Sequence, residues 1–194
     1  TLNDDPELKK SFEKQFIIGS DFSLRFNNQD GKHKFVYFSN TFSVDLSGNL
    51  AGLIIRPSSD SSRIKKIFNI PFAQFLLLSN DLRMYVGKNA GRTSWVNRLF
   101  TGYGYSYGNN QALPVVKQFY IGGSSSIRAF RNGILGPGTY YDSVQHVQAD
   151  QSGDIKIEFN SEIRLKLMKY LSTAAFIDAG NIWMRKESEE KPGS

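Results

Sequence analysis

Apolar and polar residues alternate along most of this 194-residue chain, in six long segments separated by turns and loops. Successive side chains of a β-strand point to opposite faces of a sheet, so an alternation with a period of two predicts strands. The sequence therefore predicts an all-β chain of six strands, each with one apolar face. The predicted strands cover residues 15–26, 35–50, 73–86, 93–107, 155–167 and 172–184.

The fifth segment shows the alternation most clearly. Its apolar residues are Ile155, Ile157, Phe159, Ile163, Leu165 and Leu167, and they alternate with Lys156, Glu158, Asn160, Glu162, Arg164 and Lys166. In the fourth segment, Gly102 and Gly104 lie opposite a face of tyrosines. A strand with one apolar and one charged face fits a soluble barrel, whose apolar face is buried. It fits a membrane barrel equally well, because there the apolar face meets lipid.

The lengths of strands and loops separate these two alternatives. The predicted strands have 12 to 16 residues, whereas strands of globular sheets usually have about five or six. The connections are short at 27–34, 87–92 and 168–171 and long at 55–72 and 108–153. Short turns that alternate with long loops are typical of an antiparallel up-and-down outer-membrane barrel. The pattern favours a transmembrane β-barrel, with a soluble β-sandwich or lipocalin-like barrel as the alternative.

Residues 119–140, inside the last long loop, follow neither a strand nor a helix pattern. Five glycines and a proline exclude a helix, yet the segment is rich in large apolar residues, which predicts a packed loop rather than a solvated one. The segment also contains Arg128 and Arg131. A buried arginine keeps its charge and needs carboxylate partners. The acidic residues on the polar faces of the following segments are Asp154, Glu158, Glu162 and Asp178.

Composition limits the chemistry that the chain can perform. The absence of cysteine excludes disulfides and thiolate sites, and His33 and His146 show no ligand spacing, so we expect no metal and no other cofactor. The net charge of +6 comes from scattered lysines and arginines, which does not indicate nucleic-acid binding. The stretch Gly122–Ser126 lacks the Lys-Ser/Thr of a phosphate-binding loop and the Gly-x-Ser-x-Gly of a nucleophile turn. The sequence therefore predicts no enzyme, and Asp178 is interpreted as an ion-pair partner rather than a catalytic acid.

The long loop carries a more specific signal. Residues 122–130 read Gly-Gly-Ser-Ser-Ser-Ile-Arg-Ala-Phe, and Leu-Gly-Pro-Gly follows at 135–138. This resembles the signature loop of the BamA/TamA group of outer-membrane insertases, whose core reads Val/Ile-Arg-Gly-Phe/Tyr. Ala129 replaces the usual glycine and looks like the variant of Bacteroidetes-type members. The flanks are similar as well, at Tyr103–Gly108 with Leu113-Pro114, at Glu162–Arg164 and at Phe176–Trp183. The resemblance covers about residues 95–183, and residues 1–94 match in pattern alone.

The resemblance implies that residues 1–194 are part of the outer-membrane β-barrel domain of such a protein. They would supply about six strands of a barrel of about sixteen, with a loop at about 109–153 folded into the lumen and with POTRA domains elsewhere. The implied function is the folding and insertion of β-barrel proteins into the outer membrane of a Gram-negative bacterium. The implied partners are outer-membrane lipids, client β-barrel proteins and accessory lipoproteins or surface proteins. A two-partner-secretion pore shares the signature loop and is the alternative, ahead of a soluble ligand-binding β-barrel.

The resemblance also implies the residues of a site, which joins the loop to the barrel wall. Glu162 and Asp178 look equivalent to the family's acidic partners of the loop arginine, so we expect Arg128 to bridge them and Arg131 to make a secondary contact. A turn at about 169–170 places these two acids nearly opposite each other. The expected loop residues are Gly122, Gly123, Ile127, Arg128, Ala129, Phe130, Arg131, Gly136, Pro137 and Gly138, and the expected wall residues are Glu162, Asp178, Gly102 and Gly104.

Overall fold

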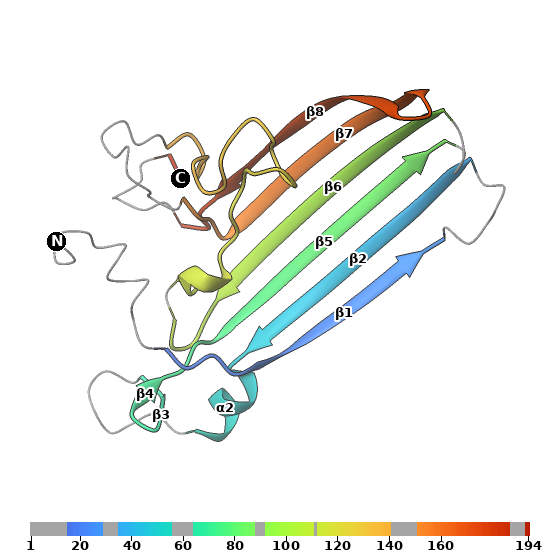
Figure 1. The fold of residues 1–194 in the computed structure, drawn as a ribbon. Helices are drawn as coiled ribbons and strands as arrows, with labels where there is room; N and C mark the ends of the chain where they lie inside the picture. The colour runs from blue at the N-terminus through green and yellow to red at the C-terminus, as the bar shows by residue number, and fades with distance from the viewer. Residues whose placement is uncertain are drawn as a thin grey trace. The chain divides into compact units, whose positions relative to one another are not determined.

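Six strands form one antiparallel sheet in which each strand pairs with the next long strand of the chain (Figure 1). The computed structural model describes residues 15–28, 35–55, 64–87, 92–110, 112–140, 151–186 and 193–194. The sheet order is β1-β2-β5-β6-β7-β8. The strands are β1 (Gly19–Asn27), β2 (Val36–Ser47), β5 (Phe75–Val86), β6 (Thr93–Ser106), β7 (Ile155–Met168) and β8 (Leu171–Trp183). The all-β, up-and-down prediction is confirmed, and these long strands are a portion of a β-barrel. His33, His146 and most of the predicted turns at 27–34 and 87–92 lie outside the described residues.

The connection between β2 and β5 differs from its prediction. The second strand was expected to reach Leu50 and a polar loop to cover 55–72, but β2 ends at Ser47 because Gly48 turns the chain with a φ of 71°. The short helix α2 (Asn49–Ile54) follows directly. The strands β3 (Lys66–Ile67) and β4 (Ile70–Pro71) then pair as a small antiparallel hairpin. No side chain caps the start of α2, so the usual sequence signal for a helix is missing.

The chain divides into two compact units. One comprises residues 1–22, 44–78 and 104–118, and the other comprises 23–43, 79–103 and 119–194. In the first unit Ala73, Phe75 and Leu113 form a buried apolar cluster, with Leu77 packed against it. An ion pair of 2.6 Å joins Lys117 to Asp45 in the same unit. The second unit contains every residue of the predicted site except Gly104.

The register of β7 and β8 corrects one detail of the predicted site. A β-bulge between Lys166 and Met168 shifts the pairing by one residue, so that Asp178 lies opposite Asn160 and Glu162 lies opposite Phe176. Glu162 and Asp178 are therefore diagonal neighbours rather than a facing pair. Because the residue numbers of both facing pairs are even, the two carboxylates still share one face of the sheet.

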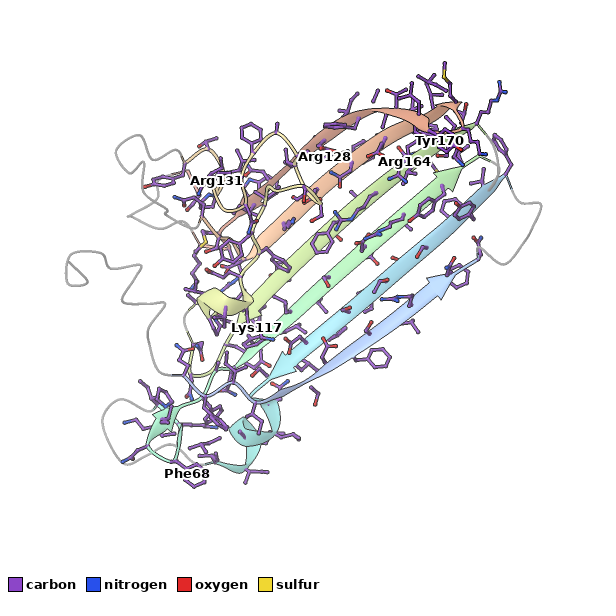
Figure 2. All side chains as sticks on the ribbon, viewed as in Figure 1. Phe68, Lys117, Arg128, Arg131, Arg164 and Tyr170 are labelled. Atoms are coloured by element: carbon purple, nitrogen blue, oxygen red, sulfur yellow. The ribbon has the colours of Figure 1, made fainter. Side chains whose placement is uncertain are left out.

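The two faces of the sheet meet different surroundings. Large apolar side chains of alternate strand residues are exposed on one face, as the sticks in Figure 2 illustrate, and among them are Phe38, Trp95, Leu99, Phe159, Ile163 and Ile177. The opposite face, called the loop face below, carries the charged residues and is covered in the second unit by residues 119–140 (Figures 1 and 2). A soluble barrel would bury its apolar face and expose its charges. The arrangement seen here, with the apolar face exposed and the charged face under the loop, is that of a membrane barrel.

None of the described helices has both the length and the apolar character that a membrane crossing demands.

Candidate functional site

The loop of residues 119–140 packs onto β6, β7 and β8 through an apolar cluster. Ile121 and Ile127 are buried against Ile182 of β8, and Phe119 and Leu135 pack around them. The loop turns sharply at Gly122, whose φ of 104° is one that glycine adopts without strain. A Cβ at this position would overlap the carbonyl group of Arg131. The glycine thus lets the two halves of the loop approach each other.

Gly102 on β6 provides the space for one ring of this cluster. A Cβ built on Gly102 would lie 2.5 Å from the ring of Phe119. The same ring meets Phe100 edge to face, with 6.2 Å between the ring centroids. The absence of a side chain at Gly102 therefore leaves room for the Phe119 ring of the loop. Gly104 is also buried, but it belongs to the first unit of the chain.

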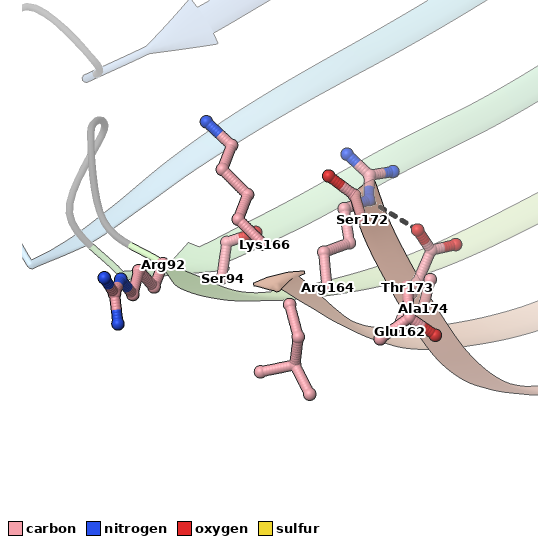
Figure 3. Close-up of a pocket in the computed structure, with 9 residues that line it drawn as sticks. Arg92, Ser94, Glu162, Arg164, Lys166, Ser172, Thr173 and Ala174 are labelled. Atoms are coloured by element: carbon pink, nitrogen blue, oxygen red, sulfur yellow. Dashed lines mark hydrogen bonds and ion pairs between the residues drawn. The ribbon is translucent and has the colours of Figure 1, made fainter. Parts of the chain in front are cut away.

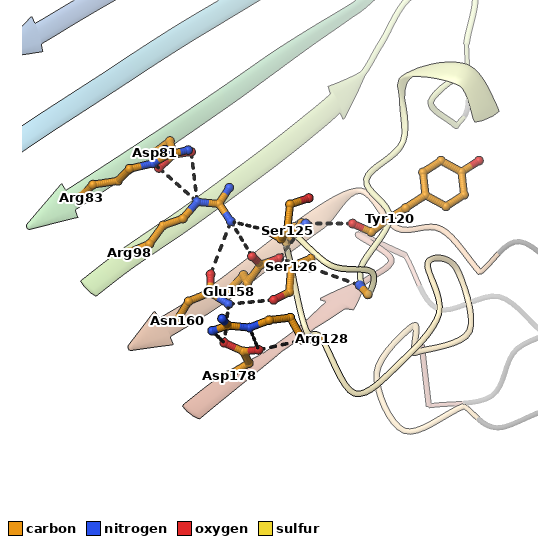
Figure 4. Close-up of polar contacts among 12 residues, drawn as sticks. Asp81, Arg83, Arg98, Tyr120, Ser125, Ser126, Arg128, Glu158, Asn160 and Asp178 are labelled. Atoms are coloured by element: carbon orange, nitrogen blue, oxygen red, sulfur yellow. Dashed lines mark hydrogen bonds and ion pairs between the residues drawn. The ribbon is translucent and has the colours of Figure 1, made fainter. Parts of the chain in front are cut away.

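Arg128 lies between the two carboxylates that the sequence pointed to. Its Nε and Nη2 donate to the two oxygens of Asp178, each at 2.8 Å (Figure 4). Its Nη1 donates to Glu162. The backbone N–H of Arg128 also donates to Asp178, at 3.2 Å. This is the two-pronged geometry that a planar guanidinium makes with a carboxylate. Hydrogen bonding to Asp178 raises the pKa of Arg128 above its already high usual value, so the residue remains charged.

Two further residues complete the Arg128 pocket, and the sequence analysis had not selected either. The guanidinium carbon lies 3.6 Å from the ring centroid of Phe176, a close cation–π contact. The Nδ2 of Asn160 donates to Asp178 at 3.0 Å. Both residues have the same strand parity as the two carboxylates. Strand parity predicts that all four side chains lie on the same face. Which of them are cross-strand neighbours depends on the register of β7 and β8, which the bulge shifts.

A second charged cluster lies deeper under the loop and is centred on Glu158. This side chain has no exposed surface. Arg98 pairs with it at 2.6 Å and Lys156 at 2.9 Å. The hydroxyl of Ser126, from the loop, also donates to Glu158. Arg98 is held from the other side by Asp81 of β5, at 3.1 Å, as Figure 4 shows.

Side chains of the wall also hold the loop by its backbone. Lys156 donates to the carbonyl of Tyr120 at 2.9 Å. Arg98 donates to the carbonyl of Ser125 at 3.1 Å, and Asn160 donates to that of Ser126 at 2.9 Å. Carbonyl groups buried beneath a loop need such donors. Side chains of the wall thus hold the first half of the loop, residues 120–126, through hydrogen bonds that do not involve Arg128.

The remaining predicted loop residues divide into two groups. Pro137 is fully buried, Gly136 packs against Ile182, and Gly138 exchanges hydrogen bonds with β8, donating to the carbonyl of Ile182 and accepting from Asn181, each at 2.7 Å. The structure does not bring the others to the wall. Gly123 is half-buried, and Ala129, Phe130 and Arg131 are exposed.

Among the described residues the side chain of Arg131 forms no ion pair, and its secondary contact stays a prediction. Arg131 follows the Ile127–Phe130 turn, whereas Arg128 lies within that turn and donates to residues of β7 and β8.

Ion pairs connect the cations of the site (Arg98, Arg128, Lys156 and Arg164) to its carboxylates (Asp81, Glu158, Glu162 and Asp178). Within the described part of the chain, no group of three acidic or histidine residues is arranged to hold a metal ion. The geometry is suited to fixing a loop against a barrel wall.

The fold and this site define a class of protein, namely an outer-membrane β-barrel with a loop docked on the charged face of its sheet. Residues 71–193 match the family model of the Omp85 superfamily domain, which is more than half of the chain. The protein therefore belongs to the Omp85 superfamily and is located in the outer membrane of a Gram-negative bacterium. Members of this family insert or translocate outer-membrane proteins and are not enzymes.

A curated relative shows the same kinship. The chain is similar to the outer membrane protein assembly factor BamA of Neisseria meningitidis serogroup B, with 26% identity over 98 residues. The matched region is 48% of this chain and 12% of that protein. The chain thus corresponds to a small part of the relative's length.

Proposed function

We propose that the protein is an insertase that folds β-barrel proteins and inserts them into the outer membrane. Residues 1–194 would be part of its barrel domain, and residues 109–153 its lumen loop. The observation that carries the proposal is the docking of the loop through Arg128 on Glu162 and Asp178. The similarity to an outer membrane protein assembly factor adds support. The proposed partners are outer-membrane lipids, client β-barrels and accessory lipoproteins or surface proteins.

The loop residues would stabilise the barrel wall while the protein folds and inserts its client proteins. Two carboxylates on one sheet face repel each other, and a guanidinium between them converts that repulsion into attraction. Arg128 would therefore couple β7 to β8 as well as fixing the loop. Gly102, Gly122 and Pro137 would shape the loop so that its arginine reaches this position.

A depletion experiment tests the proposal in the full-length protein. The chromosomal copy is placed under a repressible promoter, and the folded fraction of several unrelated outer-membrane barrels is followed by heat-modifiable mobility on gels. An insertase requires that many barrels decline together, and that Arg128→Ala restores them less well than the wild type. Loss of a single exported protein with normal levels of all barrels would instead identify a two-partner-secretion pore and reject the proposal.

A further inference from the structure

A cationic cleft lies on the loop face near the turn between β7 and β8, away from the loop. It has a volume of about 360 Å³ and is open to solvent (Figure 3). The residues that matter for its chemistry are Arg92, Ser94, Glu162, Arg164, Lys166 and Ser172. They come from the beginning of β6, the end of β7 and the beginning of β8.

Among the residues that the structure describes, the positive charge of this cleft is not balanced. Glu162 is the carboxylate in its lining, and it already accepts hydrogen bonds from Arg128 and Arg164. Neither Arg92 nor Lys166 has an ion-pair partner anywhere in the described ranges. Both side chains are exposed, and the side chain of Arg164 is 59% exposed. The cleft therefore offers cationic groups to a ligand from outside the sheet.

The spacing of the cations indicates the shape of that ligand. Arg164 and Lys166 are two residues apart on β7 and point to the same side of the sheet (Figure 3), so their attachment points lie roughly 7 Å apart. Their cross-strand neighbours are small: Ser94 and Ala174 flank Arg164, and Ser172 flanks Lys166. An extended peptide repeats its own same-side side chains at the same interval. One small anion would meet one cation, whereas such a peptide meets both.

We propose that this cleft binds an extended acidic segment of a polypeptide. Carboxylates at alternate positions of the segment pair with Arg164 and Lys166, Arg92 adds attraction at the end of the cleft, and the hydroxyls of Ser94 and Ser172 donate to the remaining carboxylate oxygens. A polypeptide fits better than a lipid headgroup because the acyl chains of lipids meet the opposite, apolar face of the sheet. The proposal concerns binding and does not depend on the insertase role.

Fluorescence anisotropy on the full-length protein in detergent tests this proposal, with a labelled peptide of alternating glutamate and serine as the probe. The double variant Arg92→Gln/Lys166→Gln should bind about tenfold more weakly than the wild type, because two surface charge pairs are lost. Lys166→Arg should retain binding, and added salt should weaken it. Arg25→Gln, on the loop face of β1, is the matched control and should bind like the wild type.

Two outcomes would overturn the proposal. Equal affinity of the wild type and the double variant, with both proteins folded by heat-modifiable mobility, would show that the cleft is not the site. Binding of phosphatidylglycerol in mixed micelles that the double variant loses, with no binding of the peptide, would show a headgroup site instead.

Discussion

Glu158 is a carboxylate without exposed surface, and two cations and a loop hydroxyl surround it. The free energy gained when such a cluster forms differs from the free energy lost when one partner is removed. Its formation costs desolvation that the ion pairs offset, but the removal of one partner leaves the others buried and uncompensated. Lys156 is the buried cation that would lose its carboxylate, whereas Arg98 would keep Asp81, and both cations also hold loop carbonyls. A change at Glu158 is therefore expected to loosen the wall and the loop together.

The first prediction is that Glu158→Gln destabilises the folded barrel by about 3–5 kcal/mol, since it takes from buried Lys156 its carboxylate partner and leaves Arg98 with Asp81 alone. The temperature at which the folded gel band converts to the unfolded one measures this. Glu162→Gln is the matched control and should cost less, because Glu162 is 17% exposed and Arg128 keeps Asp178. Equal shifts for the two variants would contradict the central place given to Glu158.

The second prediction concerns Arg128. Arg128→Ala should free the second half of the loop, so that protease cleaves within residues 127–138 while residues 120–126 stay protected by the wall. Arg128→Lys should rescue poorly, because lysine lacks the planar fork that Asp178 accepts. The cost of removing this charged hydrogen-bond donor is about 3 kcal/mol. Uniform cleavage along the whole loop would reject the idea of two separate anchors.

The third prediction is that loop docking through Arg128 does not depend on pH in the alkaline range. The pKa of Arg128 is raised in the folded protein by Asp178. A raised pKa means that the stabilisation is fully present below the usual arginine pKa and is lost only as pH rises through the folded value. Protease protection of residues 127–138 should therefore be constant from about pH 7 to about pH 10. A release within this range would point to another group as the anchor.

The loop packs closely on β6 at Gly102. The fourth prediction is that Gly102→Leu displaces the loop, because any side chain here overlaps the ring of Phe119. Protease sensitivity of residues 119–140 reports the displacement. The double variant Gly102→Ala/Phe119→Ala should be closer to the wild type than Gly102→Ala alone, since removal of the ring makes room for the new methyl group. Additive effects of the two substitutions would exclude this contact as the cause.

The fifth prediction concerns the two faces of a strand. Phe159→Lys, on the apolar face of β7, should destabilise the barrel by about 2–4 kcal/mol if it lies near mid-bilayer. Thr41→Lys, on the loop face of β2, is the control and should cost far less. Spin labels at the two positions provide a second measurement, with oxygen reaching residue 159 and a polar nickel reagent reaching residue 41. The same environment at both positions would refute the assignment of the faces.

At the scale of the whole molecule, the sequence predicted what depends on parity. Alternation located all six long strands, and their ends lie within four residues of the predicted ones. It also placed Glu162 and Asp178 on the face that receives Arg128. These features are local, because each residue's face follows from its position along its own strand.

The features that were missed depend on longer-range geometry. The bulge between Lys166 and Met168 carries no glycine or proline to mark it, yet it shifts the pairing by one residue and so brings Phe176 opposite Glu162. Glu158 and Glu162 lie on the same face of β7. The alternation shows which face each residue occupies, but it does not show how far along the strand the loop extends, so the contact of the loop with Glu158 was missed. Helix α2 was missed because six residues without a side-chain cap leave almost no helical pattern.

The hydrogen bonds from wall side chains to loop carbonyl groups affect which sequence changes the loop can tolerate. Lys156, Arg98 and Asn160 hold the carbonyls of Tyr120, Ser125 and Ser126, and every amino acid presents the same carbonyl. The wall therefore recognises the path of the loop and not the identity of the residues at 120 and 125. Ser124 and Ser125 are exposed, so this short stretch is a natural place to graft an epitope or a reporter dye. We expect amino-acid changes to be tolerated in this stretch of the loop and to be tolerated poorly at the wall residues that hold it.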